Sequence, residues 1–339
     1  MDKYQEFVSK NKLPKYRYDQ IIDAVYRQFA SDYAQVSNLP KSIQQKLSAE
    51  LPIDTLTLLK EKRAADGSTI KHLLKTPSGA IIESVLMQHS DGRNTVCVSC
   101  MSGCPVGCTF CATGQMGFRG NLTGDQIVEQ VLRFARTLQP AERRVTNVVF
   151  MGMGEPLLNL GAIKDAISVL TDENKFGIGG RRITVSTSGY IPQLQDLIEW
   201  GYRGRIAISL HAPNQQLREE LMPVVSKVYP LDKLLQKLDE FVEMTHKRIT
   251  YEYILIKDKN DLPEHAEQLI TLFKHRLAHI NLIPYNPVPG PDYKRTEPKD
   301  AVRFQNLLRQ GGLEATIRVT MGADIDSACG QLAGTLSQE

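Results

Sequence analysis

Cysteine is the residue type whose distribution in this chain of 339 residues points most directly to chemistry. Five of the six cysteines lie in one short stretch, CVSCMSGCPVGCTFCATG, at residues 97–114, and the sixth is Cys329. The first residues, MDKYQEFVSKNKLPKYRYD, lack the apolar segment of a secretory signal, so we expect a cytoplasmic protein. In that compartment thiols stay reduced, and they bind metals or act in catalysis more often than they form disulfides.

Two kinds of metal site would use these thiols. The first is a zinc site that pairs Cys97-x2-Cys100 with Cys108-x2-Cys111, but the pairs are seven residues apart, against about 15–20 in a zinc ribbon, and Cys104 is left over. The second is the iron–sulfur site Cys104-x3-Cys108-x2-Cys111. A [4Fe-4S] cluster normally takes four cysteines, so three would leave one iron open to a ligand. The spacing favours the iron–sulfur site.

The elements that must position the thiols alternate between strands and helices. Six strand-like runs follow residue 94: TVCVS, VTNVVFM, RITVSTS, RIAISLH, ITYEYILI and HINLIPY. Amphipathic helical stretches separate them, and one begins with a capping box of Thr123 and Gln126. Alternating strands and helices imply parallel β/α units. We therefore predict an α/β fold, a partial (β/α)6 TIM-like barrel that is open, since a closed barrel would need eight units.

In such folds the chemistry lies at the carboxyl ends of the strands, and the unusual residues of this chain cluster there. The cysteine stretch follows the first predicted strand, and MGMGEP follows the second. The candidate site residues at these ends are Gly154, Glu155, Ser186, Ser209, Leu210, His211 and Asn286. A lone Ser, His or Asn at a strand end is usually structural, so position alone does not assign them a function.

The segment before the β/α units has a different pattern. Apolar residues at helical spacing predict a helix in YRYDQIIDAVYRQFA, and a second helix begins near Pro40. The runs STIKHLLKT and AIIESVLMQ, joined by PSG, predict a β-hairpin. We divide the chain into a helical accessory domain at residues 1–53, a hairpin connector at 54–94 and a β/α core at 95–339.

Composition narrows the function only slightly. The formal net charge of +3 is too small to establish nucleic-acid binding by itself. No apolar run is long enough to span a bilayer, so we expect no membrane association.

The cysteine pattern resembles the signature of the radical S-adenosylmethionine (SAM) enzymes, and Phe110 matches the aromatic residue that usually precedes their last cysteine. The wider arrangement resembles one family, the RlmN/Cfr-type adenine methyltransferases of ribosomal RNA. The matching stretches are CVSCMSGCPVGCTFCATGQMGF, NLT, MGMGEPLLN, STSG, ISLHAPN, NLIPYNPVPG and DIDSACGQLAG, in that order. The helical segment that contains YRYDQI also resembles the family's N-terminal RNA-binding module.

The resemblance implies a cofactor site. Cys104, Cys108 and Cys111 would hold a [4Fe-4S] cluster whose open iron binds SAM. Gly154 and Glu155 would hold the ammonium group of SAM, a charge-assisted hydrogen bond for the carboxylate. The remaining strand-end residues would contact the ribose, adenine and carboxylate of SAM: Ser186, Ser209, Leu210, His211 and Asn286.

The resemblance also implies a mechanism that consumes two SAM molecules per turnover. One methylates Cys329, and the other is cleaved at the cluster to a radical that removes a hydrogen from this methyl group. The methylene radical then joins carbon 2 of adenine to the protein. Cys97 resolves the crosslink and forms a disulfide with Cys329, while Glu83 is the proposed proton acceptor. The alternative for Glu83 is a solvent-facing strand residue.

Further partners follow from the resemblance. The substrate is 23S rRNA, with tRNA as a second candidate, and the enzyme needs a flavodoxin-type electron donor and a thiol reductant. We expect a monomer.

Three points stay open at the level of sequence. Met321 and Ala323 stand where enzymes of the carbon-2 branch usually carry Arg and an acidic residue, so methylation of carbon 8, which confers antibiotic resistance on ribosomes, is an alternative. A non-catalytic, zinc-dependent RNA-binding protein is a second alternative. Cys100 stands where the family usually has Ser, and it has no assigned function.

Overall fold

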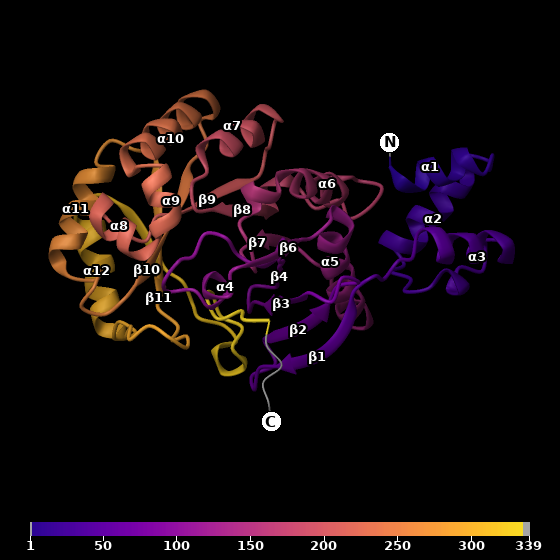
Figure 1. Ribbon diagram of the computed structural model, residues 1–339, viewed down its shortest axis with the longest axis horizontal. Coiled ribbons are helices and arrows are strands. Elements are labelled where there is room, and N and C mark those ends of the chain that lie inside the picture. Colours follow the sequence, from indigo (N-terminus) through magenta and orange to yellow (C-terminus); the bar gives the residue numbers. More distant parts are fainter. Residues whose placement is uncertain (1, 335–339) are drawn as a thin grey trace.

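A ten-stranded sheet forms the centre of this computed structural model, which describes residues 2–334 (Figure 1). In spatial order the strands are β1 (Thr57–Arg63), β2 (Thr69–Lys75), β3 (Ile81–Gln88), β4 (Asn94–Cys97), β7 (Asn147–Phe150), β8 (Ile183–Thr187), β9 (Arg205–Ser209), β10 (Ile249–Leu255), β11 (Ala278–Pro284) and β12 (Glu314–Ile317). Strands β1 to β4 pair antiparallel, and β4 to β12 pair parallel. The sheet is open between β1 and β12, as the partial barrel requires.

The six predicted strands are confirmed as β4 and β7 to β11. The predicted hairpin is confirmed as β2 and β3, and it continues the central sheet because β3 pairs with β4. Two strands at the edges of the sheet were not predicted. Strand β1 is largely exposed, and β12 has only four residues, so neither shows the buried alternation by which a strand is recognised in a sequence.

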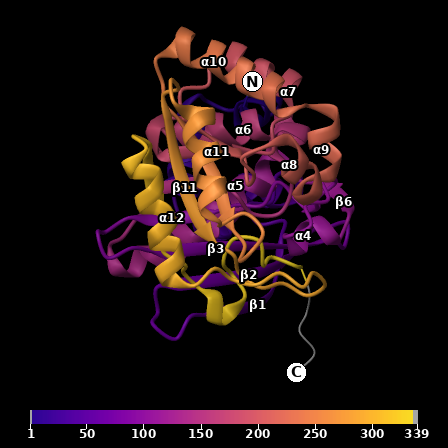
Figure 2. The ribbon, with the colours of Figure 1, turned by 90° about the vertical axis from the view of Figure 1, so that its left-hand side faces the viewer.

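Helices cover the outer face of the parallel strands (Figures 1 and 2). They are α5 (Gly124–Leu138), α6 (Leu160–Thr171), α7 (Ile191–Glu199), α10 (Leu231–Thr245), α11 (Pro263–Phe273) and α12 (Pro298–Gln310). Three short helices pack instead with the cysteine-bearing residues 104–111: α4 (Ala112–Gln115), α8 (Gln215–Leu221) and α9 (Pro223–Val228). The predicted capping box of α5 is confirmed: the Thr123 hydroxyl accepts from the Gln126 amide at 3.2 Å, and the Gln126 side chain accepts from the Thr123 amide at 3.0 Å.

Smaller elements complete the fold. A separate two-stranded sheet is formed by β5 (Met101–Gly103) and β6 (Phe118–Asn121). It flanks residues 104–111, which carry three cysteines and which we call the cysteine loop. The 3-10 helices are η1 (Tyr33–Gln35), η2 (Gln139–Ala141), η3 (Pro156–Asn159), η4 (Gly180–Arg182) and η5 (Ala323–Ile325).

The amino-terminal segment forms three helices that lie beside α5 and α6, at one end of the molecule (Figure 1). They are α1 (Lys3–Lys10), α2 (Tyr16–Tyr26) and α3 (Lys41–Glu50), of which α2 and α3 were predicted. The domain limits remain predictions, and residues 1 and 335–339, at the ends of the first and third predicted domains, lie outside the described residues.

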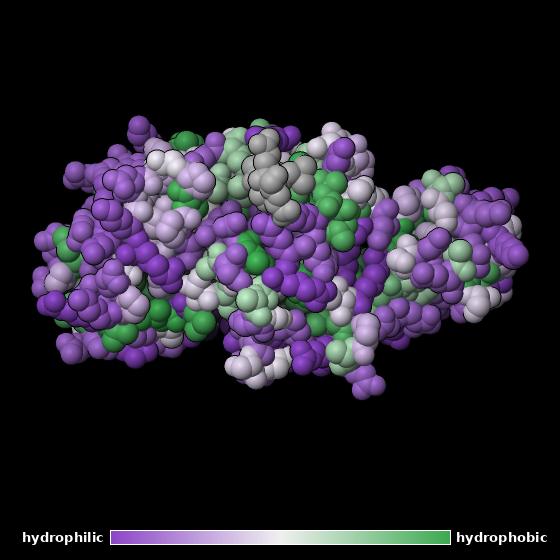
Figure 3. Space-filling view, turned by 90° about the horizontal axis from the view of Figure 1, so that it is seen from below, coloured by the Kyte–Doolittle hydropathy of each residue, from purple (hydrophilic) through white to green (hydrophobic). Residues whose placement is uncertain are grey.

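Hydrophilic residues dominate the face seen in Figure 3, with apolar residues scattered among them. Within residues 2–334, none of the helices has the length and apolar character needed to cross a membrane.

Candidate active site

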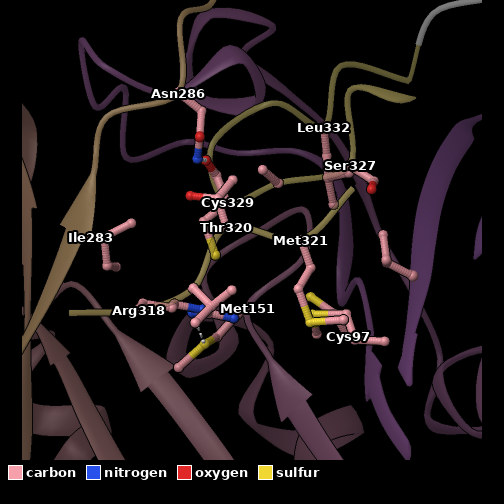
Figure 4. Close-up of a pocket in the computed structure, with 14 residues that line it drawn as sticks. Cys97, Met151, Ile283, Asn286, Arg318, Thr320, Met321, Ser327, Cys329 and Leu332 are labelled. Carbon is pink, nitrogen blue, oxygen red and sulfur yellow. Dashed lines mark hydrogen bonds between the residues drawn. The ribbon is translucent and has the colours of Figure 1, made fainter. Parts of the chain in front are cut away.

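Two cysteines from opposite ends of the core share one small pocket, which we call the cysteine pocket (Figure 4). Cys97 ends β4, and Cys329 lies in the segment after η5. The cavity has a volume of about 30 Å³, and Met151, Arg318 and Met321 are among the residues that line it with the two thiols. The structure thus brings together the two cysteines to which the resemblance assigns consecutive chemical steps.

Arg318 supplies positive charge to this pocket, and sequence reasoning missed it. It follows β12, and its amide donates to the Leu282 carbonyl at 2.8 Å, which holds it against β11. Its Nη1 lies 3.6 Å from Sδ of Met151. The Cys329 thiolate raises the pKa of Arg318 most, burial opposes this rise, and Glu252 and Cys97 add to it. Arg318 is therefore a cation that faces both thiols.

Burial dominates the ionisation of Cys97. The pKa of its thiol is raised to about 12, first by burial and then by the charge of Cys329, whereas Arg318 and the Met151 amide lower it. At neutral pH Cys97 is thus a protonated thiol. Removal of the Arg318 charge would raise its pKa further.

The three cysteines of the predicted cluster site lie on the loop between β5 and α4 and are partly exposed. Burial raises the pKa of Cys108 most, and the neighbouring charges of Cys111 and Cys104 add to this. Hydrogen bonds from backbone amides to sulfur act in the opposite direction, from Val106 to Cys104 and from Gly114 and Thr113 to Cys111. Such bonds stabilise thiolates, the form in which cysteine binds iron.

The donor set fits a [4Fe-4S] cluster. Within residues 2–334, no three Cys, His, Asp or Glu side chains converge closely enough to hold a single metal ion. In a cluster each thiolate binds a different iron, so the thiolates stand farther apart than the ligands of one ion. The donor set is three partly exposed thiols on one loop, with backbone amides directed at two of the sulfurs, and it suits the thiolate ligands of a cluster.

The cysteine loop is hydrogen-bonded to the segment that carries Cys329. The Ala112 amide donates to the Gly330 carbonyl at 2.8 Å, and the Thr113 hydroxyl donates to the Leu332 carbonyl at 2.6 Å. A Cβ at Gly114 would lie 2.9 Å from the backbone N and O of Cys108, so only glycine fits there without a shift. The loop and the carboxyl-terminal segment therefore hold a common geometry.

The glycine loop after β7 approaches the cysteine stretch closely. Gly154 has φ +108°, and a Cβ on it would lie 2.7 Å from Cβ of Met101 and 2.9 Å from Sγ of Cys100. Cys100 is 2 % exposed, and burial first, then the Glu155 charge, raises its pKa well above the ordinary value. This contact gives Cys100 a structural role: it is a small, protonated side chain on which the glycine loop packs.

Glu155 is buried beside this loop and is hydrogen-bonded through both oxygens. Oε2 accepts from the Ser188 amide at 2.8 Å and from the Ser188 hydroxyl at 2.7 Å, and Oε1 accepts from the Leu157 amide at 3.0 Å. Burial raises the pKa of Glu155, and the Ser188 hydroxyl opposes this. Ser188 was not predicted, although it belongs to the quoted STSG stretch.

His211 lies at the end of β9 in the left-handed region, with φ 57°. Its Nδ1 accepts from the Ile254 amide at 3.1 Å, so a proton on the neutral ring resides on Nε2. Burial and then the charge of Arg218 lower its pKa to about 3, which keeps the imidazole neutral. The ring meets Phe110 of the cysteine loop edge-to-face, with centroids 4.7 Å apart.

The other predicted contact residues also lie at the carboxyl ends of strands. Ser186 on β8 and Ser209 on β9 are half-buried, whereas Leu210 is fully buried. Asn286 donates from Nδ2 to the Cys329 carbonyl at 3.2 Å, and its Oδ1 accepts from Arg295 at 2.7 Å. Asn286 thus orients the Cys329 segment in this structure.

Glu83 does not line the cysteine pocket; it lines an adjacent cavity. Its Oε1 is 3.2 Å from Nζ of Lys71, and its Oε2 accepts from the Ala333 amide at 3.0 Å. Glu83 is 3 % exposed, so the alternative of a solvent-facing strand residue is wrong.

All six cysteines are free thiols in the structure. The disulfide between Cys97 and Cys329 therefore stays a prediction of the resemblance.

Comparisons with known proteins agree with this site. The model of the radical SAM superfamily matches residues 98–272. The crystal structure of a radical SAM methyltransferase from Sphaerobacter thermophilus is 42% identical, with a TM-score of 0.95 over 99% of this chain and 100% of that one. The fold and the cysteine loop thus define a radical SAM methyltransferase.

Two curated relatives narrow the class. The probable dual-specificity RNA methyltransferase RlmN of Dictyoglomus thermophilum is 42% identical over 319 residues, 94% of this chain and 90% of that protein. The protein of the same name from Salinibacter ruber is 41% identical over 336 residues, 97% of this chain and 91% of that protein. The chain belongs to the RlmN family of RNA methyltransferases.

Family membership settles the class of cofactor. Radical SAM methyltransferases use a [4Fe-4S] cluster and SAM, as the cysteine spacing predicted. The alternative of a non-catalytic, zinc-dependent RNA-binding protein is thereby not supported.

Proposed function

We propose that this enzyme methylates carbon 2 of an adenine in 23S rRNA and in tRNA, with Cys329 as the carrier of the methyl group. The observation that carries the proposal is the cysteine pocket, in which Cys329, Cys97 and Arg318 meet. An ordinary methyl transfer would need no second thiol at this point. A carrier that becomes crosslinked to the base needs one to release the product.

Each group of residues has one task in this proposal. Cys104, Cys108 and Cys111 hold the cluster, which when bound supplies the electron that cleaves SAM. Glu155, held in place by Ser188, accepts hydrogen bonds from the ammonium of SAM, and Gly154 lets the preceding loop pack closely on Met101 and Cys100. The proposed contacts to the rest of SAM are Ser186, Ser209, Leu210, His211 and Asn286.

The cysteine pocket performs the transfer to RNA. Cys329 receives a methyl group on its sulfur, in a pocket that Arg318 also lines. Cys97 acts in its thiolate form, which burial disfavours and the Arg318 charge favours. It removes the ring proton at carbon 2; its sulfur then bonds to the Cys329 sulfur as the carbon–sulfur bond of the crosslink breaks, and the proton passes to the new methyl group.

Glu83 remains a proposed proton acceptor. Its Oε1 lies 3.2 Å from Nζ of Lys71, and the carboxylate lines the cavity beside the cysteine pocket. We further propose a cytoplasmic monomer that takes electrons from a flavodoxin-type donor and is reset by a thiol reductant.

Nucleoside mass spectrometry tests the position of methylation. Purified holoenzyme is given SAM, a reducing system and unmodified 23S rRNA or tRNA, and the digested RNA is analysed. We expect 2-methyladenosine from both. Met321 makes the cysteine pocket more apolar than an arginine would, as the carbon-8 alternative requires. The appearance of 8-methyladenosine without 2-methyladenosine would therefore establish that alternative.

Substitutions of the two cysteines test the carrier mechanism. We expect Cys97→Ala to abolish turnover and to accumulate a covalent protein–RNA adduct, because the crosslink forms but is not resolved. Cys329→Ala should give neither product nor adduct. Both species are measured by denaturing gel and intact mass.

The matched control is Cys100→Ser, at the buried thiol that packs on Gly154. It should retain iron and product formation. Equal product from Cys329→Ala and the unaltered enzyme would exclude the methyl-cysteine carrier.

A further inference from the structure

A second cavity, which we call the lysine cavity, adjoins the cysteine pocket and has a volume of about 190 Å³. Its basic wall consists of Lys60 and Lys62 on β1 and Lys71 on β2. The remaining residues that line it are Leu73, Glu83, Pro287, Val288, Pro289, Asp326, Gln331 and Ala333. It thus combines three ammonium groups with two carboxylates, those of Glu83 and Asp326.

The register of the sheet concentrates positive charge at this wall. Lys62 on β1 lies directly opposite Lys71 on β2. Like charges directly opposite one another destabilise an antiparallel pair. Lys60 and Lys62 are two residues apart, so they share one face of the strand, and both are half-buried.

Lys71 is held by groups of the carboxyl-terminal segment and of β3. Its Nζ is 3.2 Å from Oε1 of Glu83 and donates to the Asp326 carbonyl at 2.9 Å. The cavity as a whole carries more positive than negative charge, with Lys60 and Lys62 on its β1 wall. A bound anion would relieve the repulsion between Lys62 and Lys71.

The same segments wall both cavities. In the segment after η5, Cys329 and its neighbours Ser327, Ala328 and Leu332 line the cysteine pocket, whereas Asp326, Gln331 and Ala333 line the lysine cavity. Asn286 lines the cysteine pocket, and residues 287–289 line the lysine cavity. One layer of chain therefore separates the methyl-carrying thiol from the lysines.

This juxtaposition fits one nucleotide of RNA. An enzyme that modifies a base takes that base out of the stack and into a pocket, while the phosphate of the same or the next nucleotide stays on the backbone outside. None of the residues proposed to hold SAM lines the lysine cavity. Lysine recognises phosphate as a point charge and needs no planar geometry.

We propose that the lysine cavity binds a backbone phosphate of the substrate RNA, beside the nucleotide whose adenine is presented to Cys329. Lys60 and Lys62 contact the phosphate oxygens, and Lys71 holds Glu83 and the carboxyl-terminal segment in place. This inference rests on the proposed function and adds to it a site that positions the substrate.

The salt dependence of RNA binding tests the proposal. Full-length holoenzyme is titrated with a 23S rRNA fragment that contains the target adenine, between about 50 and 200 mM salt. For a single strand, each neutralised phosphate contributes about 0.7 to the slope of log K against log salt. Because Lys60 and Lys62 bind one phosphate, we expect the double variant Lys60→Ala/Lys62→Ala to lower the slope by about 0.7. The control Lys233→Ala, on the exposed face of α10, should keep the slope of the unaltered enzyme.

Neutral methylphosphonate linkages locate the bound phosphate. They are placed one at a time beside the target adenine, and one position should weaken binding to the unaltered enzyme by roughly fivefold, because the linkage carries no charge for the lysines to bind. The same linkage should have no further effect on the double variant. An equal loss of affinity in both proteins at every position would overturn the proposal, as would an unchanged salt slope in the double variant.

Iron content and unfolding temperature confirm that the double variant is folded and loaded. Failure of the proposed function is a distinct result, because the unaltered enzyme would then neither bind nor methylate the fragment. If the unaltered enzyme methylates the fragment normally and the double variant keeps an unchanged salt slope, only the proposal that the lysine cavity binds a phosphate is overturned.

Discussion

At the scale of single residues, the site depends on one cation that shares a pocket with two thiols. Arg318 is half-buried, and its own pKa is raised above the ordinary value mainly by the Cys329 thiolate. Its charge lowers the pKa of Cys97, against the larger opposite effect of burial. The balance between burial and this charge sets how readily the Cys97 thiol loses its proton.

Replacement of Arg318 tests this balance. Because Arg318→Met removes the cation, we expect the pKa of Cys97 to rise and its reaction with a small thiol reagent to slow by about tenfold at a given pH, for a shift of one pKa unit. Thiolate forms as pH rises, so the rate profile of the variant should move to higher pH. Mass spectrometry of the Cys97 peptide measures the rate.

The control Arg318→Lys keeps the charge and should keep the profile near that of the unaltered enzyme. A profile for Arg318→Met that coincides with that of Arg318→Lys would contradict the assigned role.

At the scale of elements, helix α5 connects the amino-terminal helices to the core. Glu129 accepts from the amides of Thr55 at 2.7 Å and Leu56 at 2.9 Å. Arg136 forms a two-point ion pair with Asp54, at 2.9 and 2.8 Å, and donates to the Phe29 carbonyl at 2.9 Å. One amphipathic helix thus packs on the sheet and holds the segment between α2 and β1.

The ion pair of Arg136 carries a testable share of stability. Arg136→Met leaves Asp54 with only its longer ion pair to Arg133, at 3.5 Å, and we expect the free energy of unfolding to fall by about 2 kcal/mol, the range for hydrogen bonds to charged groups. Urea unfolding measures the fall, and limited proteolysis should show earlier cleavage between α2 and α3. Arg303→Met, on the exposed face of α12, is the matched control. Equal stability of the two variants would refute the role of Arg136.

At the scale of the whole molecule, the cysteine loop and the carboxyl-terminal segment that carries Cys329 are joined by hydrogen bonds. Bonds from Ala112 to Gly330 and from Thr113 to Leu332 join them, although they lie at opposite ends of the core sequence. The central sheet supports this contact, because Lys71 of β2 donates to the Asp326 carbonyl at 2.9 Å and Glu83 of β3 accepts from the Ala333 amide at 3.0 Å.

Removal of the cluster should therefore loosen both parts. After anaerobic chelation of iron, we expect amide exchange to rise on the order of tenfold in residues 104–116 and, equally, in residues 326–333, because local opening of one frees the bonds of the other. Helix α10, on the far side of the molecule, should be unaffected. Faster exchange in the cysteine loop alone would show that the two parts are independent.

Local patterns in the sequence predicted most of the fold. The six parallel strands, the hairpin and the capping box of α5 depend on periodicity and on residues close together in the chain. Strands β1 and β12 were missed because the first is an exposed edge and the second is very short.

The sequence by itself predicted the class of chemistry: the spacing of Cys104, Cys108 and Cys111 indicates a cluster site, and this signal is local because the three residues lie close together in the chain. Only the tertiary structure decided which distant groups meet. The meeting of Arg318, Cys97 and Cys329 in one pocket follows from pairing and packing of segments far apart in the chain. So does the alignment of Lys62 with Lys71, because strand register is set by the whole sheet and by no local motif.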